Sequence, residues 1–269
     1  MTTIACEEIT LYGLRLKCPT DGSIFPALRL NCYESMEVLQ TLAWAKPGDT
    51  VVDVGACVGL YTLLLARAIG PTGAVYAVEA EPVNASLVVE NSVLNGFGNV
   101  TVIRCAASNC TGWQRLHISP DNAGDHCLWA ADGTREVLDV EAVPLDVFLA
   151  GKVVQFMKVD VQGWEAKVLE GVKETICRQS AMALLVEYWP RGLRSAGSSE
   201  QELVALLYDC FGLQVYGFEP VNLVRDYKVD YDRADGYKLV PLAKDDLLAR
   251  IDPLTSDAFF NLWCVKGQQ

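Results

Sequence analysis

Metal-binding and disulfide patterns are scarce in this chain of 269 residues. It has only two histidines, His117 and His126, and none of its ten cysteines stands in a Cys-x-x-Cys pair. Zinc sites are usually built from such pairs or from cysteine with histidine, so no metal site is expected. No signal peptide is recognisable, which argues against a disulfide framework. We therefore expect the cysteines to be small buried hydrophobic residues in a reducing cytoplasm.

Positive charge and long apolar runs are lacking as well. The chain has 22 Lys and Arg against 34 Asp and Glu, a formal net charge of −12, with no basic cluster. Nucleic acids bind concentrated positive charge, so they are not expected as partners. No apolar run reaches the roughly 18 residues that span a membrane, so no membrane association is expected. With 51% hydrophobic residues, the composition is that of an ordinary globular protein that can bury a large core.

The hydrophobic pattern alternates between strand-like and helix-like segments. Residues 1–32 predict short strands, the last of them IFPALRLNC at 24–32, and 33–45 predict a helix. Further strands are expected at 50–54, 73–80, 99–105, 136–143, 153–161, 181–189, 213–219 and 258–266, and helices at 60–69, 84–95, 165–179 and 199–210. Apolar strands separated by helices indicate an open α/β sheet covered on both faces. We expect an N-terminal extension, 1–46, before a main domain, 47–269.

A break of small residues stands between the strand at 50–54 and the following helix. The sequence there is VVDVGACVGL, with Gly55 and Gly59 after the carboxylate of Asp53. In an open α/β sheet, ligands bind beyond the carboxyl ends of the strands, where glycine lets the backbone approach them. The next strand ends in Glu79, where an acidic residue can bind ribose hydroxyls. The alternative is that both glycines only shape a tight turn.

The break lacks the middle glycine of the dinucleotide fingerprint, because Cys57 occupies that position. The missing glycine and the nearby carboxylate favour a nucleoside with a cationic, amino-acid-like group over NAD. A nucleotide-dependent oxidoreductase is therefore disfavoured.

These residues resemble a known family. The segment KPGDTVVDVGACVGLYTLLLAR is similar to the first motif of class I S-adenosylmethionine-dependent methyltransferases, and more narrowly of the FkbM family. VYAVEAEP, NAGDHCL, MKVDVQGWEAKVLEG, LLVEYWPRGLRSAG and FFNLWCVK resemble FkbM segments in the expected order. The resemblance implies a Rossmann-like, seven-stranded sheet, S-adenosylmethionine as cofactor with S-adenosylhomocysteine as product, and methyl transfer to an oxygen or nitrogen. In one departure, Gln162 stands where the family commonly has glutamate.

By motif match, the resemblance also implies a set of cofactor-binding residues: Asp53, Gly55, Ala56, Gly59, Glu79, Ala80, Ala106, Ala107, Ser108 and Asp160. Asp160 and His126 are the candidates for accepting the acceptor's proton, since a hydroxyl must lose one during methyl transfer. Candidates for binding the acceptor are Asn122, Asp125, His126, Gln162, Trp164, Glu187 and Trp189. Two alternatives stay open: Asp160 caps the following helix, and Lys158 forms an ion pair with Asp160 or Glu165.

The sequence therefore predicts methyl transfer to a hydroxyl oxygen of a small molecule, a sugar or a secondary metabolite, in natural product biosynthesis. N-methylation of an amine or amide, including a peptide side chain, is the first alternative. A non-catalytic nucleoside-binding protein is the second. Whether the chain forms a homodimer is left open.

Overall fold

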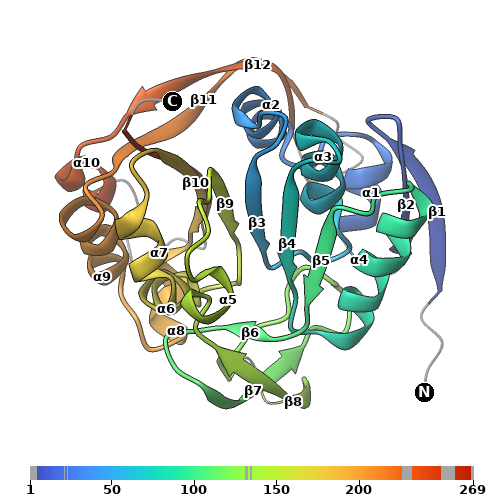
Figure 1. The fold of residues 1–269 in the computed structure, drawn as a ribbon, viewed down its shortest axis with the longest axis horizontal. Coiled ribbons are helices and arrows are strands. Elements are labelled where there is room, and N and C mark those ends of the chain that lie inside the picture. The colour runs from blue at the N-terminus through green and yellow to red at the C-terminus, as the bar shows by residue number, and fades with distance from the viewer. Residues whose placement is uncertain are drawn as a thin grey trace.

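The computed structural model describes residues 5–20, 22, 24–130, 133, 135–225, 232–249 and 258–267. Its main sheet has eight strands, in the order β12-β11-β13-β10-β9-β3-β4-β5 (Figure 1). They are β3 (Thr50–Val54), β4 (Ala74–Val78), β5 (Val100–Ile103), β9 (Phe156–Val159), β10 (Met182–Tyr188), β11 (Gln214–Arg225), β12 (Asp232–Pro241) and β13 (Phe260–Lys266). Five neighbouring strands, in the order β10, β9, β3, β4 and β5, pair in parallel. The remaining pairs, β10 with β13, β13 with β11 and β11 with β12, are antiparallel. The predicted α/β architecture is confirmed.

Helices cover both faces of this sheet (Figure 1). They are α1 (Ile24–Arg29), α2 (Ser35–Trp44), α3 (Leu60–Ile69), α4 (Pro82–Leu94), α5 (Asp146–Leu149), α6 (Glu165–Gly171), α7 (Lys173–Arg178), α8 (Pro190–Ser195), α9 (Glu200–Ala205) and α10 (Lys244–Ala249), with a π-helical turn at Leu206–Cys210. Successive strand residues point to opposite faces. Val51, Phe156, Leu185 and Trp263 therefore pack with α1 to α3, whereas Val52, Met157, Leu184 and Cys264 pack with α5 to α10.

The parallel strands also fix where a ligand can bind. After β3, the chain builds β4 and β5 on one side and later returns to add β9 and β10 on the other. The strand order therefore reverses between β3 and β9, and a crevice opens there beyond the strand ends. A smaller sheet of β6 (Ala106–Ala107), β8 (Glu136–Val143) and β7 (Gly112–Ile118) follows β5 in the chain.

The N-terminal segment contributes a hairpin, β1 (Cys6–Leu11) with β2 (Leu14–Pro19), and the helices α1 and α2. The strand predicted over 24–32 is wrong, because residues Ile24–Arg29 form helix α1. Ile24, Phe25 and Leu28 are buried on one side at helical spacing, and Pro26 is tolerated in the first turn.

Four further predictions need correction. The expected seven-stranded sheet has an eighth strand, β12, at its edge. The helix predicted over 165–179 is divided into α6 and α7 at Val172, and the one predicted over 199–210 ends in the π-helical turn. Of the ten cysteines, five are buried, while Cys110 and Cys177 are exposed. Within the described residues, no helix is long and apolar enough to cross a membrane.

Candidate functional site

The glycine break forms a tight turn against the end of β9. Gly55 has φ 79°, and a Cβ atom at this position would lie 1.8 Å from the Asp160 carbonyl oxygen. No other amino acid fits there without moving the backbone, because both the dihedral angle and the space require glycine. The turn therefore brings the β3–α3 connection directly beside the residue that follows β9.

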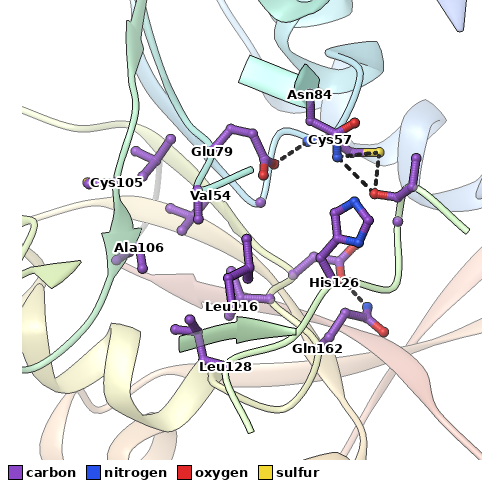
Figure 2. A pocket seen from close by; sticks show the side chains of 18 residues that line it. Val54, Cys57, Glu79, Asn84, Cys105, Ala106, Leu116, His126, Leu128 and Gln162 are labelled. Carbon is purple, nitrogen blue, oxygen red and sulfur yellow. Dashed lines mark hydrogen bonds between the residues drawn. The ribbon is translucent and has the colours of Figure 1, made fainter. Parts of the chain in front are cut away.

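A pocket lies beyond the carboxyl ends of β3, β4 and β5, and it encloses about 550 Å³, part of it open to solvent. Glu79 is on its wall (Figure 2). One Glu79 oxygen accepts the Cys57 backbone N–H at 2.8 Å, and the other accepts the Glu81 N–H at 2.8 Å. Burial raises the pKa of Glu79 to about 7, although the two N–H donors act against this. Each oxygen keeps a lone pair for a further donor.

The rest of this pocket is mostly apolar. Its lining includes Val54, Val78, Ala80, Cys105, Ala106, Ala107, Leu116, Ala123, Leu128 and Val161. A flat apolar ring system fits such walls, and the Glu79 carboxylate supplies the polar contact at one end.

The loop at residues 121–129 covers part of this pocket. The Asn84 side-chain amide donates to the Ala123 carbonyl oxygen at 2.9 Å, and the Cys57 thiol lies 3.5 Å from the same oxygen (Figure 2). At the far end of the loop, the Trp129 indole N–H donates to the Gln162 carbonyl oxygen at 2.8 Å. The loop is thus tied to the glycine turn, to α4 and to the segment after β9.

His126 belongs to this loop and lines the pocket. Its Nδ1 accepts the Ser119 backbone N–H at 3.0 Å, and burial lowers its pKa. A neutral imidazole whose Nδ1 accepts carries its proton on Nε2, so His126 can donate a hydrogen bond to a ligand. This arrangement does not favour His126 as the general base, and that role stays a prediction.

A second pocket adjoins the first and shares Gly55, Cys57, Gly124 and Asp160 with it. Asp53 lines the second pocket and is 1% exposed. Its Oδ2 accepts the Thr62 hydroxyl at 2.6 Å, while its Oδ1 is buried and has no hydrogen-bond partner in the described part of the chain. The Asp53 side chain therefore offers one unused acceptor inside a pocket.

Asp160 lies where the two pockets meet, as its position after β9 predicts. Its Oδ2 accepts the Lys158 ammonium at 2.6 Å, and its Oδ1 accepts the Gln162 amide at 2.9 Å. The Lys158–Asp160 ion pair confirms one of the two pairings expected for Lys158. Burial alone would lower the pKa of Lys158, but Asp160, Glu34 and Asp53 more than offset it and raise that pKa.

Asp160 does not cap the following helix. No side-chain cap is present at the start of α6 among the described residues; instead Glu165, its first residue, holds the preceding turn, because its Oε1 accepts the Val161 and Gly163 backbone N–H groups, both at 3.0 Å. Gln162 in turn extends its amide to Glu187 on β10, at 3.3 Å. Asp160, Gln162 and Glu187 thus form one polar chain, and the first two line the pockets.

Other predicted site residues lie outside the two pockets. The Trp164 indole N–H donates to the Ser108 hydroxyl at 3.2 Å, and both side chains are buried in the fold. Asp125 pairs with Arg135 at 2.5 Å, and Asn122 accepts the Gly124 backbone N–H at 3.0 Å, so both shape the loop.

Three more predicted residues are near the site without lining either pocket: Gly59, Glu187 and Trp189. Gly59 precedes α3, and the Trp189 ring lies 6.1 Å from the Trp129 ring. Ala56 does line the second pocket.

The sequence reasoning missed several residues at the second pocket. Tyr33 and Tyr61 line it, and Glu34 at the start of α2 acts electrostatically on Lys158. A polar residue at the first turn of a helix was the available signal for Glu34, but only the packing of α2 on the sheet gives it a role. Among the described residues, no group of three or more His, Cys, Asp or Glu could hold a metal ion.

Comparison with known proteins agrees with this geometry. The family model described as "Methyltransferase FkbM domain" matches residues 53–219. A Beauveria bassiana (strain ARSEF 2860) protein, "Methyltransferase 1", is 28% identical over 151 residues, which cover 48% of this chain and 60% of that protein. "31-O-demethyl-FK506 methyltransferase FkbM" of Streptomyces tacrolimicus is 27% identical over 161 residues, covering 48% and 61%. The chain thus spans about three fifths of the length of these relatives.

Among solved structures, methyltransferase FkbM from Methylobacillus flagellatus KT is 18% identical, with a TM-score of 0.45. The alignment covers 65% of this chain and 40% of that one. The fold of the present chain is established from its own strand order.

Proposed function

The chain belongs to the FkbM methyltransferase family, and from this premise we propose that it transfers a methyl group from S-adenosylmethionine to a hydroxyl oxygen of a small molecule, a sugar or a secondary metabolite, in a biosynthetic pathway. The carboxylate of Glu79 is the observation that carries the proposal. Glu79 directly follows β4, the first strand after the glycine turn; its carboxylate is fixed by two backbone N–H groups and lines a pocket of nucleoside size. Its free lone pairs match the two hydroxyls of a ribose.

The residues present fit the rest of the cofactor. The apolar wall with Ala106 and Ala107 suits an adenine ring, and Ala80 lies beside Glu79. Because Gly55 has no Cβ, the turn lies directly against the Asp160 backbone, which brings Asp53 and Asp160 to one end of the site. The unpartnered Oδ1 of Asp53 is an acceptor for the methionine ammonium group. Asp53, Gly55, Ala56 and Asp160 would then line the methionine end.

The bound sulfonium would supply an activated methyl carbon, so the protein's own contribution is positioning and removal of a proton. Asp160 stands where the two pockets meet and is our proposed group for orienting the acceptor hydroxyl and accepting its proton. Lys158 and Gln162 hold both of its oxygens in place. His126 would donate from Nε2 to the ligand.

Calorimetric titration with S-adenosylmethionine, with NAD in parallel, tests the proposal. We expect saturable binding of S-adenosylmethionine in the micromolar range and none of NAD. Screening sugar, polyketide and peptide acceptors for S-adenosylhomocysteine formation then identifies the methylated atom. Absence of S-adenosylmethionine binding would overturn the proposal, and NAD binding would move the chain to a different chemistry.

A further inference from the structure

Lys158 on β9 is a buried cation inside the second pocket. Its side chain is 4% exposed and lines that pocket together with Asp53 and Asp160. Of its three N–H donors, one is used by Asp160 at 2.6 Å, and the ammonium lies over the Tyr61 ring, 4.9 Å from the centroid. No other described residue accepts a hydrogen bond from it. At least one buried N–H is therefore left for a partner that these residues do not supply.

Asp53 offers the complementary group on the neighbouring strand. Asp53 on β3 is the register partner of Lys158 on β9, so the two side chains leave the sheet side by side on one face. Both line the second pocket, and Oδ1 of Asp53 is buried with no hydrogen bond from any residue that the structure describes. One wall of the pocket thus presents an unused acceptor beside an unused donor.

Positive charge is scarce around the two pockets. Among the described residues that line them, Lys158 is the only lysine or arginine. His126, in the first pocket, is neutral, because burial lowers its pKa and its Nδ1 accepts a backbone N–H. Burial also lowers the pKa of Lys158, but the carboxylates around it, Asp160 foremost, raise it by more, so its ammonium stays charged. An anionic ligand group in these pockets therefore has one side-chain cation with which to pair.

The start of α3 adds a weaker positive field. Gly59 precedes this helix, no described side chain caps it, and Leu60 and Tyr61 in its first turn line the second pocket. The N–H groups of a first helical turn lack partners within the helix and carry partial positive charge. The second pocket thus combines the full charge of Lys158 with a helix end of the same sign, and both favour an anion.

We propose that Lys158 binds the carboxylate of the methionine part of S-adenosylmethionine, beside the ammonium group that Asp53 accepts. This inference rests on the proposed function, and it assigns the second pocket to the amino-acid end of the methyl donor. In an α-amino acid the ammonium and the carboxylate are attached to one carbon atom. They therefore need an acceptor and a donor side by side, as Asp53 and Lys158 are. The ion pair with Asp160 fixes the Lys158 ammonium in place.

The assignment has a consequence for ligand selection. A nucleoside without the carboxylate would leave a buried N–H of Lys158 unpaired, which costs free energy. The site should therefore discriminate against adenosine derivatives that fill the first pocket and keep the ammonium but lack the carboxylate.

Three ligands test this by calorimetric titration into the full chain. S-adenosylhomocysteine has both charged groups, decarboxylated S-adenosylhomocysteine keeps only the ammonium, and methylthioadenosine has neither. We expect the first to bind at least about tenfold more tightly than the second, because a charge-assisted hydrogen bond is lost.

Variants then assign each charged group to a residue. Lys158→Gln, whose amide can still donate to Asp160, should bring the affinities for S-adenosylhomocysteine and its decarboxylated analogue to nearly the same value and leave methylthioadenosine unchanged. Asp53→Asn should weaken both ligands that carry the ammonium by similar factors. Lys173→Gln, at an exposed position at the start of α7, is the matched control and should change none of the three.

Each other result has a separate meaning. Equal affinity for S-adenosylhomocysteine and its decarboxylated analogue in the unmodified protein overturns the inference, and so does a preference that persists in Lys158→Gln. Loss of methylthioadenosine binding in Lys158→Gln means that the site has not folded. Lys158→Met combined with Asp160→Asn, which removes the buried ion pair without leaving a lone charge, then carries the same expectation and the same test. If the unmodified protein binds none of the three ligands, the proposed function itself fails.

Discussion

At the scale of single residues, Glu79 has a role that its two backbone contacts make testable. Replacing it by alanine leaves the Cys57 and Glu81 N–H groups unpaired and removes the acceptors for a ribose. We expect Glu79→Ala to weaken S-adenosylmethionine binding by about 1–3 kcal/mol, the usual cost of unpaired buried partners. Calorimetry measures the loss, with Glu90→Ala as the control because Glu90 lies on the exposed side of α4. Unchanged affinity in Glu79→Ala would remove this residue from the cofactor site.

Glu165 predicts how stability depends on pH. Burial raises its pKa to about 7, and none of the residues that the structure describes makes a hydrogen bond to its Oε2. Because this pKa is higher in the folded than in the unfolded chain, the stabilisation is complete below about pH 4 and is lost as pH rises through about 7. Glu165→Gln keeps an acceptor for the Val161 and Gly163 N–H groups without the charge.

Urea unfolding at pH 5 and pH 8 measures this effect. From pH 5 to pH 8, the free energy of unfolding of Glu165→Gln should rise by roughly 1–3 kcal/mol relative to that of the unmodified protein. Glu174→Gln, at an exposed position on α7, controls for general charge effects. If the difference between Glu165→Gln and the unmodified protein is the same at both pH values, the carboxylate is ionised throughout and the argument is wrong.

How far single site residues could be predicted depends on where they stand in the chain. Asp53, Glu79 and Asp160 follow or end apolar strands, and the ends of parallel strands meet at one edge, so their convergence could be expected. Glu34 and Tyr61 could not be found in this way. Their positions depend on how α2 and α3 pack over the sheet, which no local pattern encodes. Trp164 stands in the motif MKVDVQGWEAKVLEG, yet its indole N–H donates to the Ser108 hydroxyl in the core and its side chain lines neither pocket.

At the scale of elements, the glycine turn requires both a positive φ and the absence of a Cβ at Gly55. Two variants test these requirements separately. Gly55 and Gly96 both have positive φ, 79° and 71°, but an added Cβ meets the Asp160 carbonyl oxygen at 1.8 Å only at Gly55 and nothing within 4 Å at Gly96. Gly96→Ala should cost about 1–2 kcal/mol of backbone strain. Gly55→Ala should lower the free energy of unfolding, measured in urea, by more than Gly96→Ala does. It should also abolish S-adenosylmethionine binding. Equal losses in the two variants would mean that the contact with β9 does not matter.

The loop at 121–129 covers part of the first pocket, and an Asn84 side-chain hydrogen bond holds it there. Asn84→Ala removes the hydrogen bond to the Ala123 carbonyl oxygen. A bond of this kind contributes roughly 0.5–1.5 kcal/mol, so S-adenosylmethionine affinity should fall several-fold and the loop amides should exchange faster. Ser86→Ala, on the exposed side of the same helix, should change neither. Unchanged exchange in Asn84→Ala would show that other contacts hold the loop.

Most elements could be predicted because their hydrophobic period is clear, as in α3, whose bounds match the expected 60–69. The failures have physical causes. In IFPALRLNC only Arg29 and Asn31 are polar, and their alternation with Leu28, Leu30 and Cys32 is typical of a strand. Packing of Ile24, Phe25 and Leu28 in the same buried cluster as α3 and the hairpin makes the segment a helix instead. In β12, DRADGYKLVP has few apolar residues, and its pairing with β11 makes it a strand.

At the scale of the whole molecule, the predicted boundary between an N-terminal extension, 1–46, and a main domain, 47–269, remains a proposal. Core contacts across this boundary argue against two separate units. The Trp44 ring lies 5.8 Å from Trp263, and its indole N–H donates to the Gln155 carbonyl oxygen at 3.0 Å. Leu16 from the hairpin belongs to the same buried cluster as Leu63 of α3. A segment that shares a core with the sheet should not unfold apart from it.

Leu16→Ala tests this directly, because Leu16 is 1% exposed. If 1–46 and the remaining chain form one cooperative unit, the variant should lose about 2–5 kcal/mol of unfolding free energy in a single transition. Circular dichroism and tryptophan fluorescence should then give the same midpoint, since Trp44 and Trp263 report on the shared core. Val93→Ala, at a 73% exposed position on α4, should leave the midpoint nearly unchanged. Two separate transitions would instead establish the N-terminal segment as a unit of its own, so that Tyr33 would leave the second pocket while the glycine turn and its strands stay folded.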